Sequence, residues 1–443
     1  MDEGEGIFKL ALSEQEAGRW GEAQRLYEAL LAARPELLAV RNNLAVCCLE
    51  MGEPERALSL LDFESPSLEA KTNRGNAQRA LGRFGQAEAE YAVVAEKAPM
   101  DPRALSNLAL AQQDQGRLGE AVSNFRRAVA LAPNDASLRA NLGGALLMSG
   151  AYAEGFAAQE FRLIGSATEA QMKRAGLPMW DGSALKGRRL LIWTEQGLGD
   201  SLQFLRFLKG LDGPVVLMAQ QALHRLAGAI ATVERVLGWD EPVPSCDVQC
   251  ALLSLPRLLG IDTEEKIPPS TLSPDPLLTE LWGQRLQGIK GRRIGLSWQG
   301  NAAMKADRFR SAPLSAFKSL FDLEGVSWLS LQTGVGREQI AGLDAPLLDL
   351  GAEIADLADT AAIMAHLDLV ISVDSAAAHL AGSLGRPVWI LVRANPDWRW
   401  PPGLQSSPWY PSARLWRQER LGDWSFVVAK MAQTLPRFFP SPG

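Results

Sequence analysis

Cysteine and histidine are scarce in this chain of 443 residues. Cys47 and Cys48 are adjacent, while Cys246 and Cys250 flank an apparent strand, CDVQCALL, so neither pair has the spacing of a zinc site. The three histidines lie far apart in the sequence and are too few for a histidine-rich metal centre. We therefore expect buried free thiols and no bound metal.

Long apolar runs and an excess of basic residues are also missing. Without 18 consecutive apolar residues no membrane span is expected, and a net charge of −6 argues against a nucleic-acid partner. The first residues, MDEGEGIFKLALSEQEAG, lack the basic start and apolar core of a signal peptide, so we expect a cytoplasmic protein. The apolar fraction of 47% and the length fit a soluble protein of two or three domains.

Residues 4–165 carry an internal repeat. Glycines recur at spacings of 34, 30, 34 and 34 residues, at Gly18, Gly52, Gly82, Gly116 and Gly150. A small residue follows each glycine five positions later, at Ala23, Ala57, Ala87, Ala121 and Gly155. The glycine ends one helix and the small residue lets the next helix pack closely. This pattern resembles the tetratricopeptide repeat, whose helix pairs stack into a superhelix.

Two repeats depart from this pattern. The second is short and ends in LLDFESPS, which predicts a loop or kink, and the fifth has Gly155 where alanine is usual, so we expect a cap that docks on the next part of the chain. One position of the first helix is asparagine in four repeats, at Asn43, Asn73, Asn107 and Asn141. These amides are expected to line a groove that binds the backbone of an acceptor peptide; the alternative is solvation or contacts between repeats.

After Gly165, short apolar runs alternate with helical stretches, which predicts parallel α/β structure. Expected strands are 187–193, 214–220 and 246–253 in a first half, and 292–298, 326–332, 346–351, 367–373 and 387–392 in a second half. The proline-rich segment 266–276 reads as the linker. The chain is thus expected to be α plus α/β, with a repeat solenoid over 1–165 followed by a short Rossmann-like domain over 166–275 and another over 276–443.

A polar turn follows the first strand of this region, Glu195-Gln196-Gly197-Leu198-Gly199-Asp200. Asp200 is expected near a helix N-terminus, where its carboxylate could take a proton from an acceptor hydroxyl. Alternatively it only caps the helix. Glu195 is a second candidate for the same catalytic role.

A second turn follows the first strand of the second half. It begins with Trp298, Gln299 and Asn301 and continues into a cationic stretch that includes Lys305 and Arg308. Cations at the carboxyl end of a strand can neutralise a diphosphate, although a solvated charged loop would look the same.

The strand 367–373 leads directly into Asp374, Ser375 and Ala376, and His379 follows within the first helical turn. A helix N-terminus beside the carboxyl end of a parallel strand is a common phosphate site. His379 is expected to contact phosphate or ribose, or else to satisfy a neighbouring carbonyl. The aromatic residues of 398–410 either stack on a ligand or pack over the sheet.

Three motifs in order, GLGDSLQFLRFL, LSWQGN followed by DRFRS, and DSAAAHLAGSLGRPVWIL, resemble bacterial tetratricopeptide-repeat proteins with a family 9, heptosyltransferase-like domain. The resemblance implies a GT-B fold and inverting, metal-free transfer from a nucleotide-sugar, with no other cofactor. Asp200 then matches the base, Lys305 the donor-phosphate loop, and Asp374, Ser375 and His379 the donor segment. Two departures stand out from the family pattern, Ala376 in place of glycine and Met304 in place of a frequent histidine.

The layout is also similar to the eukaryotic enzyme that attaches N-acetylglucosamine to proteins, and to bacterial flagellin-modifying transferases. We therefore expect a cytoplasmic protein O-glycosyltransferase whose repeats capture the acceptor, with flagellin as the expected acceptor. Two alternatives stay open at this point: a transferase acting on a lipid or saccharide, and a repeat scaffold whose transferase half is inactive.

Overall fold

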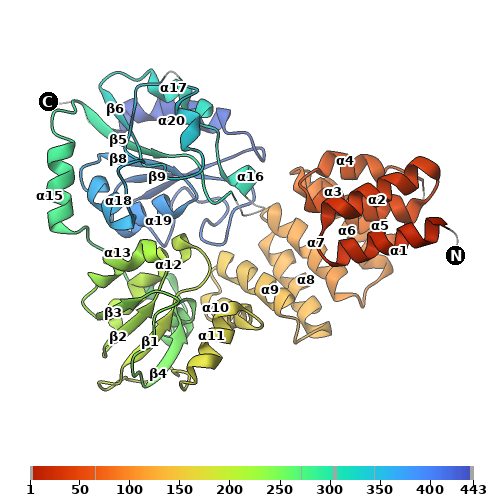
Figure 1. Cartoon of the computed structure of the whole chain (residues 1–443), viewed down its shortest axis with the longest axis horizontal. Helices are drawn as coiled ribbons and strands as arrows, with labels where there is room; N and C mark the ends of the chain where they lie inside the picture. Colours follow the sequence, from red (N-terminus) through yellow and green to blue (C-terminus); the bar gives the residue numbers. More distant parts are fainter. Residues whose placement is uncertain (1–2, 65, 271, 303–306, 344, 440–443) are drawn as a thin grey trace. The chain divides into compact units, whose positions relative to one another are not determined.

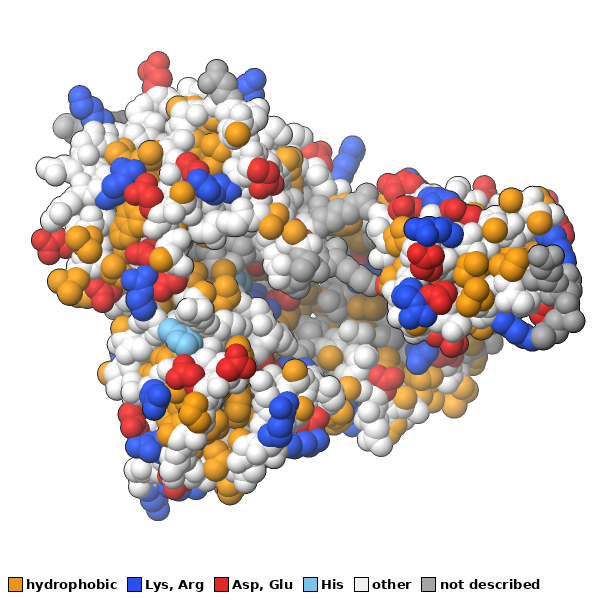
Figure 2. Space-filling view, viewed as in Figure 1, with side chains coloured by type: hydrophobic (Ala, Val, Ile, Leu, Met, Phe, Trp, Pro, Cys, Tyr) orange, Lys and Arg blue, Asp and Glu red, His pale blue; other side chains and the backbone are white. Residues whose placement is uncertain are grey.

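The computed structural model describes residues 3–64, 66–270, 272–302, 307–343 and 345–439 (Figure 1). The chain divides into two compact units, Met1–Ala145 and Leu146–Gly443. No helix in the described ranges is both long and apolar enough to cross a membrane. Figure 2 shows acidic and basic side chains interspersed over the visible face.

The first unit is a series of antiparallel helix pairs. Its helices are α1 (Glu3–Glu16), α2 (Trp20–Ala33), α3 (Leu38–Glu50), α4 (Pro54–Leu60), α5 (Leu68–Ala80), α6 (Phe84–Lys97), α7 (Pro102–Asp114), α8 (Leu118–Leu131) and the start of α9 (Ala136–Met148). The repeat glycines lie at the turns, and Gly18 and Gly116 have φ of 73° and 76°, which favours glycine there. The repeat prediction is confirmed.

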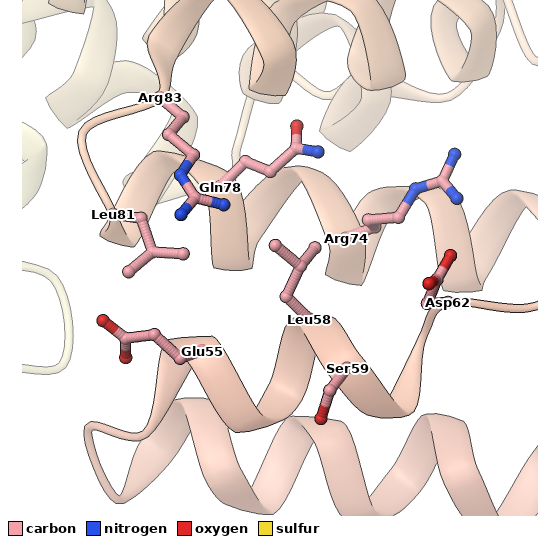
Figure 3. Close-up of a pocket in the computed structure, with 8 residues that line it drawn as sticks. All are labelled: Glu55, Leu58, Ser59, Asp62, Arg74, Gln78, Leu81 and Arg83. Atoms are coloured by element: carbon pink, nitrogen blue, oxygen red, sulfur yellow. The ribbon is translucent and has the colours of Figure 1, made fainter.

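The small repeat residues Ala23, Ala57, Ala87 and Ala121 are completely buried. The short second repeat behaves as expected, because α4 has only seven residues and no helix resumes until Leu68. Between α4 and α5 lies a cavity of about 460 Å³, into which Leu58 points (Figure 3).

The first half of the second unit contains a four-stranded parallel sheet in the order β3-β2-β1-β4. Its strands are β1 (Leu190–Trp193), β2 (Val215–Met218), β3 (Val233–Leu237) and β4 (Val248–Ala251). Its helices are α10 (Tyr152–Gln159), η1 (Glu160–Leu163), α11 (Ala167–Ala175), α12 (Leu198–Phe204), η2 (Leu205–Gly210), η3 (Gln221–Leu223), α13 (His224–Gly228), η4 (Leu252–Ser254), α14 (Leu255–Leu258) and η5 (Glu264–Lys266). The sequence analysis missed β3, an edge strand with exposed charged residues at its centre.

The second half contains a six-stranded parallel sheet in the order β10-β9-β8-β5-β6-β7, the doubly wound order of a Rossmann fold. Its strands are β5 (Arg292–Ser297), β6 (Val326–Ser330), β7 (Leu347–Asp349), β8 (Leu369–Val373), β9 (Val388–Val392) and β10 (Ala413–Arg417). Its helices are α15 (Pro276–Arg285), α16 (Asp307–Arg310), η6 (Leu314–Phe317), α17 (Lys318–Phe321), η7 (Arg337–Ile340), α18 (Leu357–Met364), α19 (Ala376–Ser383) and α20 (Ser425–Phe438). The predicted fold class is therefore confirmed, with β10 as a further missed edge strand.

The fifth repeat belongs mostly to the second unit. Contacts divide the chain after Ala145, earlier than the expected boundary at residue 165. The reason is aromatic packing, because Tyr152 and Phe156 of α10 lie against Trp409 and Trp398, with ring centroids 6.1 and 6.3 Å apart. The expected docking of this repeat on a later part of the chain is thus observed.

Gly155 replaces alanine for a steric reason. A Cβ at this position would lie 2.8 Å from the side chain of Leu147 in α9. The helices α9 and α10 therefore pack more closely than an alanine would allow.

Candidate functional site

The second sheet has its topological switch point between β5 and β8, where ligands bind in doubly wound folds. Asp374 directly follows β8, and His379 lies one turn into α19. The His379 ring contacts Asp374 Oδ1 at 3.6 Å through Nε2 and Tyr410 Oη at 2.8 Å through Nδ1. Burial by itself raises the pKa of Asp374, but His379 and the charge of Arg310 hold that pKa below its ordinary value. A carboxylate is therefore maintained at the mouth of the switch point.

The N-terminus of α19 faces the same place. Ser375 is its N-cap residue, but the hydroxyl contacts Ser372 Oγ at 3.0 Å and does not cap the helix. Ala376 and Ala377 in the first turn are partly exposed. Amides at a helix start that no side chain caps can accept an anionic ligand.

The loop after β5 is fixed by Gln332, which the sequence analysis did not single out. Its buried Oε1 accepts hydrogen bonds from the amides of Trp298 and Gln299 at 3.1 and 3.0 Å. The Trp298 indole is fully buried and donates to Gly336 O, so this side chain packs in the core, and its expected contact with the donor stays a prediction.

The cationic stretch contains a buried polar cluster. Asp307 accepts from Gln299 Nε2 at 2.5 Å, from Ser311 Oγ at 2.9 Å and from Arg310 Nη2 at 3.0 Å. These contacts hold Gln299 and Arg310 in place beside the switch point, while Asn301 is exposed.

The structure does not describe the side chains at three positions of this loop. Met304, Lys305 and the side chain of Arg308 lie outside the described residues. The donor-binding roles expected for Lys305 and Arg308 therefore stay predictions.

Asp200 lies in the first turn of α12. Its Oδ2 accepts from the amide of the N-cap residue Gly197 at 2.9 Å, so Asp200 helps to cap the helix from its first turn without being the N-cap, and its role as base stays a prediction. Its Oδ1 is paired with the buried guanidinium of Arg399 from the second half of the unit, which also binds Gln203 and Asp397. Both carboxylate oxygens of Asp200 are thus engaged, and one of them reaches across the unit.

The helices α12 and α19 bring the two halves together (Figure 1). A Cβ at Gly199 would lie only 2.6 Å from Cδ2 of His379. Asp200, the next residue, is therefore placed beside the helix that carries Ser375 and His379.

Glu195 is differently placed. It is buried and accepts from Arg162 Nη2 at 2.6 Å, from Arg162 Nε at 3.1 Å and from the Leu253 amide at 3.2 Å. These contacts fill the switch point of the first sheet, between β1 and β4, and favour a structural role for Glu195 over proton transfer. Arg162 lies in the segment EFRL after the last repeat helix and had no distinguishing sequence signal.

The four repeat asparagines have different surroundings within the first unit. Asn73 is buried and donates to Asn42 Oδ1 at 2.9 Å, Asn43 donates to Tyr27 Oη at 3.3 Å, and Asn141 donates to Ser106 Oγ at 3.4 Å. Asn43, Asn107 and Asn141 are partly exposed. The alternative of contacts between helices thus applies to Asn73 above all, and the acceptor-binding role of the partly exposed three stays a prediction.

The cavity in the first unit was not foreseen either. Leu58 and Leu81 line it together with Glu55, Asp62 and Arg83 (Figure 3). It exists because the second helix of repeat two is truncated, and it offers both apolar and charged contacts.

Comparisons with known proteins agree with this architecture. Residues 15–62, 72–136 and 107–162 match tetratricopeptide repeat families, and residues 337–421 match glycosyltransferase family 9 (heptosyltransferase). The family 9 match includes Asp374, Ser375, His379 and Arg399 but not Asp200. The chain is 29% identical to Protein FlbA of Caulobacter vibrioides over 476 aligned residues, which cover 99% of this chain and 74% of FlbA.

Solved structures resemble parts of the chain more distantly. A thermophilic tetratricopeptide-repeat protein of Thermus thermophilus is 19% identical, with a TM-score of 0.35. The match covers 39% of this chain and 97% of the Thermus chain. MamA of Desulfovibrio magneticus is 17% identical, with a TM-score of 0.32, covering 40% and 97%. The family matches support a glycosyltransferase domain that follows N-terminal tetratricopeptide repeats.

Proposed function

We propose that this repeat-bearing glycosyltransferase moves a sugar from a nucleotide-sugar to a serine or threonine hydroxyl of a protein captured by its repeats, in the cytoplasm. The observation that carries the proposal is the approach of α12 to α19, which sets Asp200 of one half beside His379 and the uncapped helix start of the other. A donor at the second switch point would thus face a carboxylate from the opposite half.

The donor phosphates are assigned to the start of α19. Ser375 and the amides of Ala376 and Ala377 would bind phosphate oxygens, and the nearby Arg310 adds positive charge. His379 is held by Tyr410 and lies close enough to contact phosphate or ribose. In this proposal the helix start and the cations stabilise the leaving nucleotide, so no metal ion is needed.

The transfer step is a single displacement. The acceptor oxygen attacks the anomeric carbon, the bond from that carbon to the nucleotide phosphate breaks with its electron pair, and Asp200 takes the hydroxyl proton. The configuration at the anomeric carbon inverts. Arg399 pairs with Asp200 Oδ1 through one nitrogen, which leaves a lone pair on this oxygen that can receive the proton.

The acceptor is assigned to the repeat unit, where Asn43, Asn107 and Asn141 are partly exposed at one repeat position. Flagellin is the acceptor we propose, by analogy with transferases of similar layout. The match to FlbA covers nearly the whole chain and so includes the repeats as well as the transferase part.

The test begins with donor binding. Thermal unfolding of the full chain is followed with UDP, GDP, CMP and ADP and their sugars, since a ligand at 100 times its Kd stabilises the folded state by about 2.7 kcal/mol. One nucleotide should raise Tm, and the rise should disappear in His379→Ala but persist in His224→Ala, a partly buried histidine elsewhere in the unit. No rise with any nucleotide would favour an inactive scaffold.

The acceptor arm uses flagellin and a free saccharide acceptor with the donor so identified. Replacing Asn43, Asn107 and Asn141 by alanine should weaken transfer to the protein and leave donor binding intact. Equal transfer to flagellin by this triple variant, or transfer to the saccharide alone, would contradict protein capture by the repeats.

A further inference from the structure

The turn that carries Asp200 is anchored from behind by the segment that ends the repeats. The Arg162 side chain in η1 is only 7% exposed and reaches Glu195 with two nitrogens, at 2.6 and 3.1 Å, and Ser254 Oγ at 3.1 Å. Glu195 is the first residue of the turn, and the Leu253 amide completes its contacts. The ion pair therefore ties η1 to the ends of both β1 and β4.

The turn itself needs such an anchor. Gln196 has a φ of 58°, a left-handed conformation that is unfavourable for a residue with a side chain and persists only where its surroundings impose it. The Gln196 side chain is exposed, so the constraint comes from the backbone: the Gln196 carbonyl accepts from Gln220 Nε2 at 3.3 Å, and both flanking residues are held as well. On one side is Glu195, held by Arg162, and on the other is Gly197, whose amide binds Asp200.

The same segment also touches Trp398, which is next to Arg399, the partner of Asp200. Phe156 in α10 packs edge-on against Trp398, and the guanidinium carbon of Arg399 lies 4.3 Å from the centre of the Trp398 ring. The segment α10–η1 thus contacts the chain near Asp200, through Glu195, and the chain next to Arg399, through Trp398. All of these residues lie in the second unit.

We propose that Arg162 is a positioning residue for glycosyl transfer: through Glu195 it fixes the turn that aims Asp200 at the acceptor hydroxyl. This inference rests on the proposed function, because it takes Asp200 as the base. In this proposal the segment α10–η1 continues the repeats and also positions a catalytic residue of the transferase domain. Arg162 touches no substrate in this scheme and acts only through Glu195.

The test compares Arg162→Met and Arg162→Lys with the control Arg257→Met in the full chain. Arg257 also pairs with η1, at 3.2 Å from Glu160, but makes no ion pair with Glu195 among the described residues. Amide hydrogen exchange is measured for residues 196–204, and release of nucleotide is measured from UDP-, GDP-, CMP- or ADP-sugars. The lysine variant keeps a charge for Glu195 but loses the two-nitrogen geometry.

In Arg162→Met we expect at least tenfold faster exchange in 196–204 and at least a tenfold lower kcat, with KM for the donor within threefold of the unmodified chain. Arg162→Lys should recover part of both losses, and Arg257→Met should change neither. A purely structural role would lower the amount of folded protein without this separation of kcat from KM.

The outcomes separate the two proposals. Unchanged exchange in 196–204 overturns the anchor, and faster exchange with an unchanged kcat overturns its role in transfer. If the unmodified chain releases nucleotide from none of the four donor classes, the proposed function fails. The exchange data would then still decide whether Arg162 holds the turn.

Discussion

An alanine at Gly199 is expected to strain the contact between the two halves of the second unit. The added Cβ would lie 2.6 Å from His379 Cδ2 and 3.1 Å from Nε2, well inside ordinary van der Waals contact. His379 is buried and bound to Tyr410 Oη at 2.8 Å, so it cannot move aside without losing that hydrogen bond. The strain must therefore be relieved by moving α12 from α19 or by displacing the histidine.

The magnitude is the sum of three effects. Overpacking costs about 1–3 kcal/mol and the lost hydrogen bond about 1 kcal/mol, while alanine gains about 1 kcal/mol over glycine in a helix. The net loss of unfolding free energy is about 1–3 kcal/mol, or roughly 2–5 °C in Tm for a unit of this size. Donor affinity should fall as well, because His379 is at the switch point.

The assay is thermal and urea unfolding of the full chain, with Gly228→Ala as the matched control. Gly228 ends α13, and the nearest atom to its added Cβ would be Val236 Cγ2 at 3.9 Å, an ordinary contact. If Gly199→Ala is as stable as Gly228→Ala and binds donor equally well, the close approach of α12 to His379 is refuted.

Three further predictions concern different parts of the chain. Asp200→Asn should abolish transfer and leave donor affinity within a few-fold; full transfer activity would exclude this carboxylate as the base. Burial raises the pKa of Cys47 and Cys48 to about 11, so at pH 8 both thiols should react with Ellman's reagent only after denaturation, and fast labelling of the native chain would contradict their burial. Burial by itself raises the pKa of Asp359, but hydrogen bonds from the Trp282 indole and Arg225 outweigh burial and hold that pKa below its ordinary value. The Asp359 carboxylate therefore stabilises the fold above pH about 4, and this contribution is lost as the pH falls through the pKa of the folded state. Urea midpoints between pH 7 and pH 3 should thus fall less steeply in Asp359→Asn, and parallel curves for the two proteins would contradict the depressed pKa.

The repeats could be predicted from the sequence because their determinants are local and periodic. A glycine at each turn and a small residue five positions later encode a helix pair within one stretch of chain, and the structure keeps this pattern down to the truncated second repeat. The buried strands β1, β5 and β8 were equally clear, since apolar runs flanked by turn residues leave few alternatives. The edge strands β3 (VERVL) and β10 (ARLWR) were missed because charged residues interrupt their apolar runs.

The site depended on contacts between residues far apart in the chain. The sequence brought Asp374, Ser375 and His379 together because one strand-to-helix turn contains all three. It held no sign that Arg399 pairs with Asp200, or that Arg162 pairs with Glu195.

By itself the sequence determined the order of the parts, the fold class and the positions of the polar turns, because these depend on periodicity and local backbone preference. Only the tertiary structure decided which side chains of those turns are accessible to a ligand and which are buried or already paired. Trp298 and Glu195 stand in the right turns, but one is buried in the core and the other in an ion pair. Burial and pairing depend on what the rest of the chain packs against a residue, and no local pattern records that.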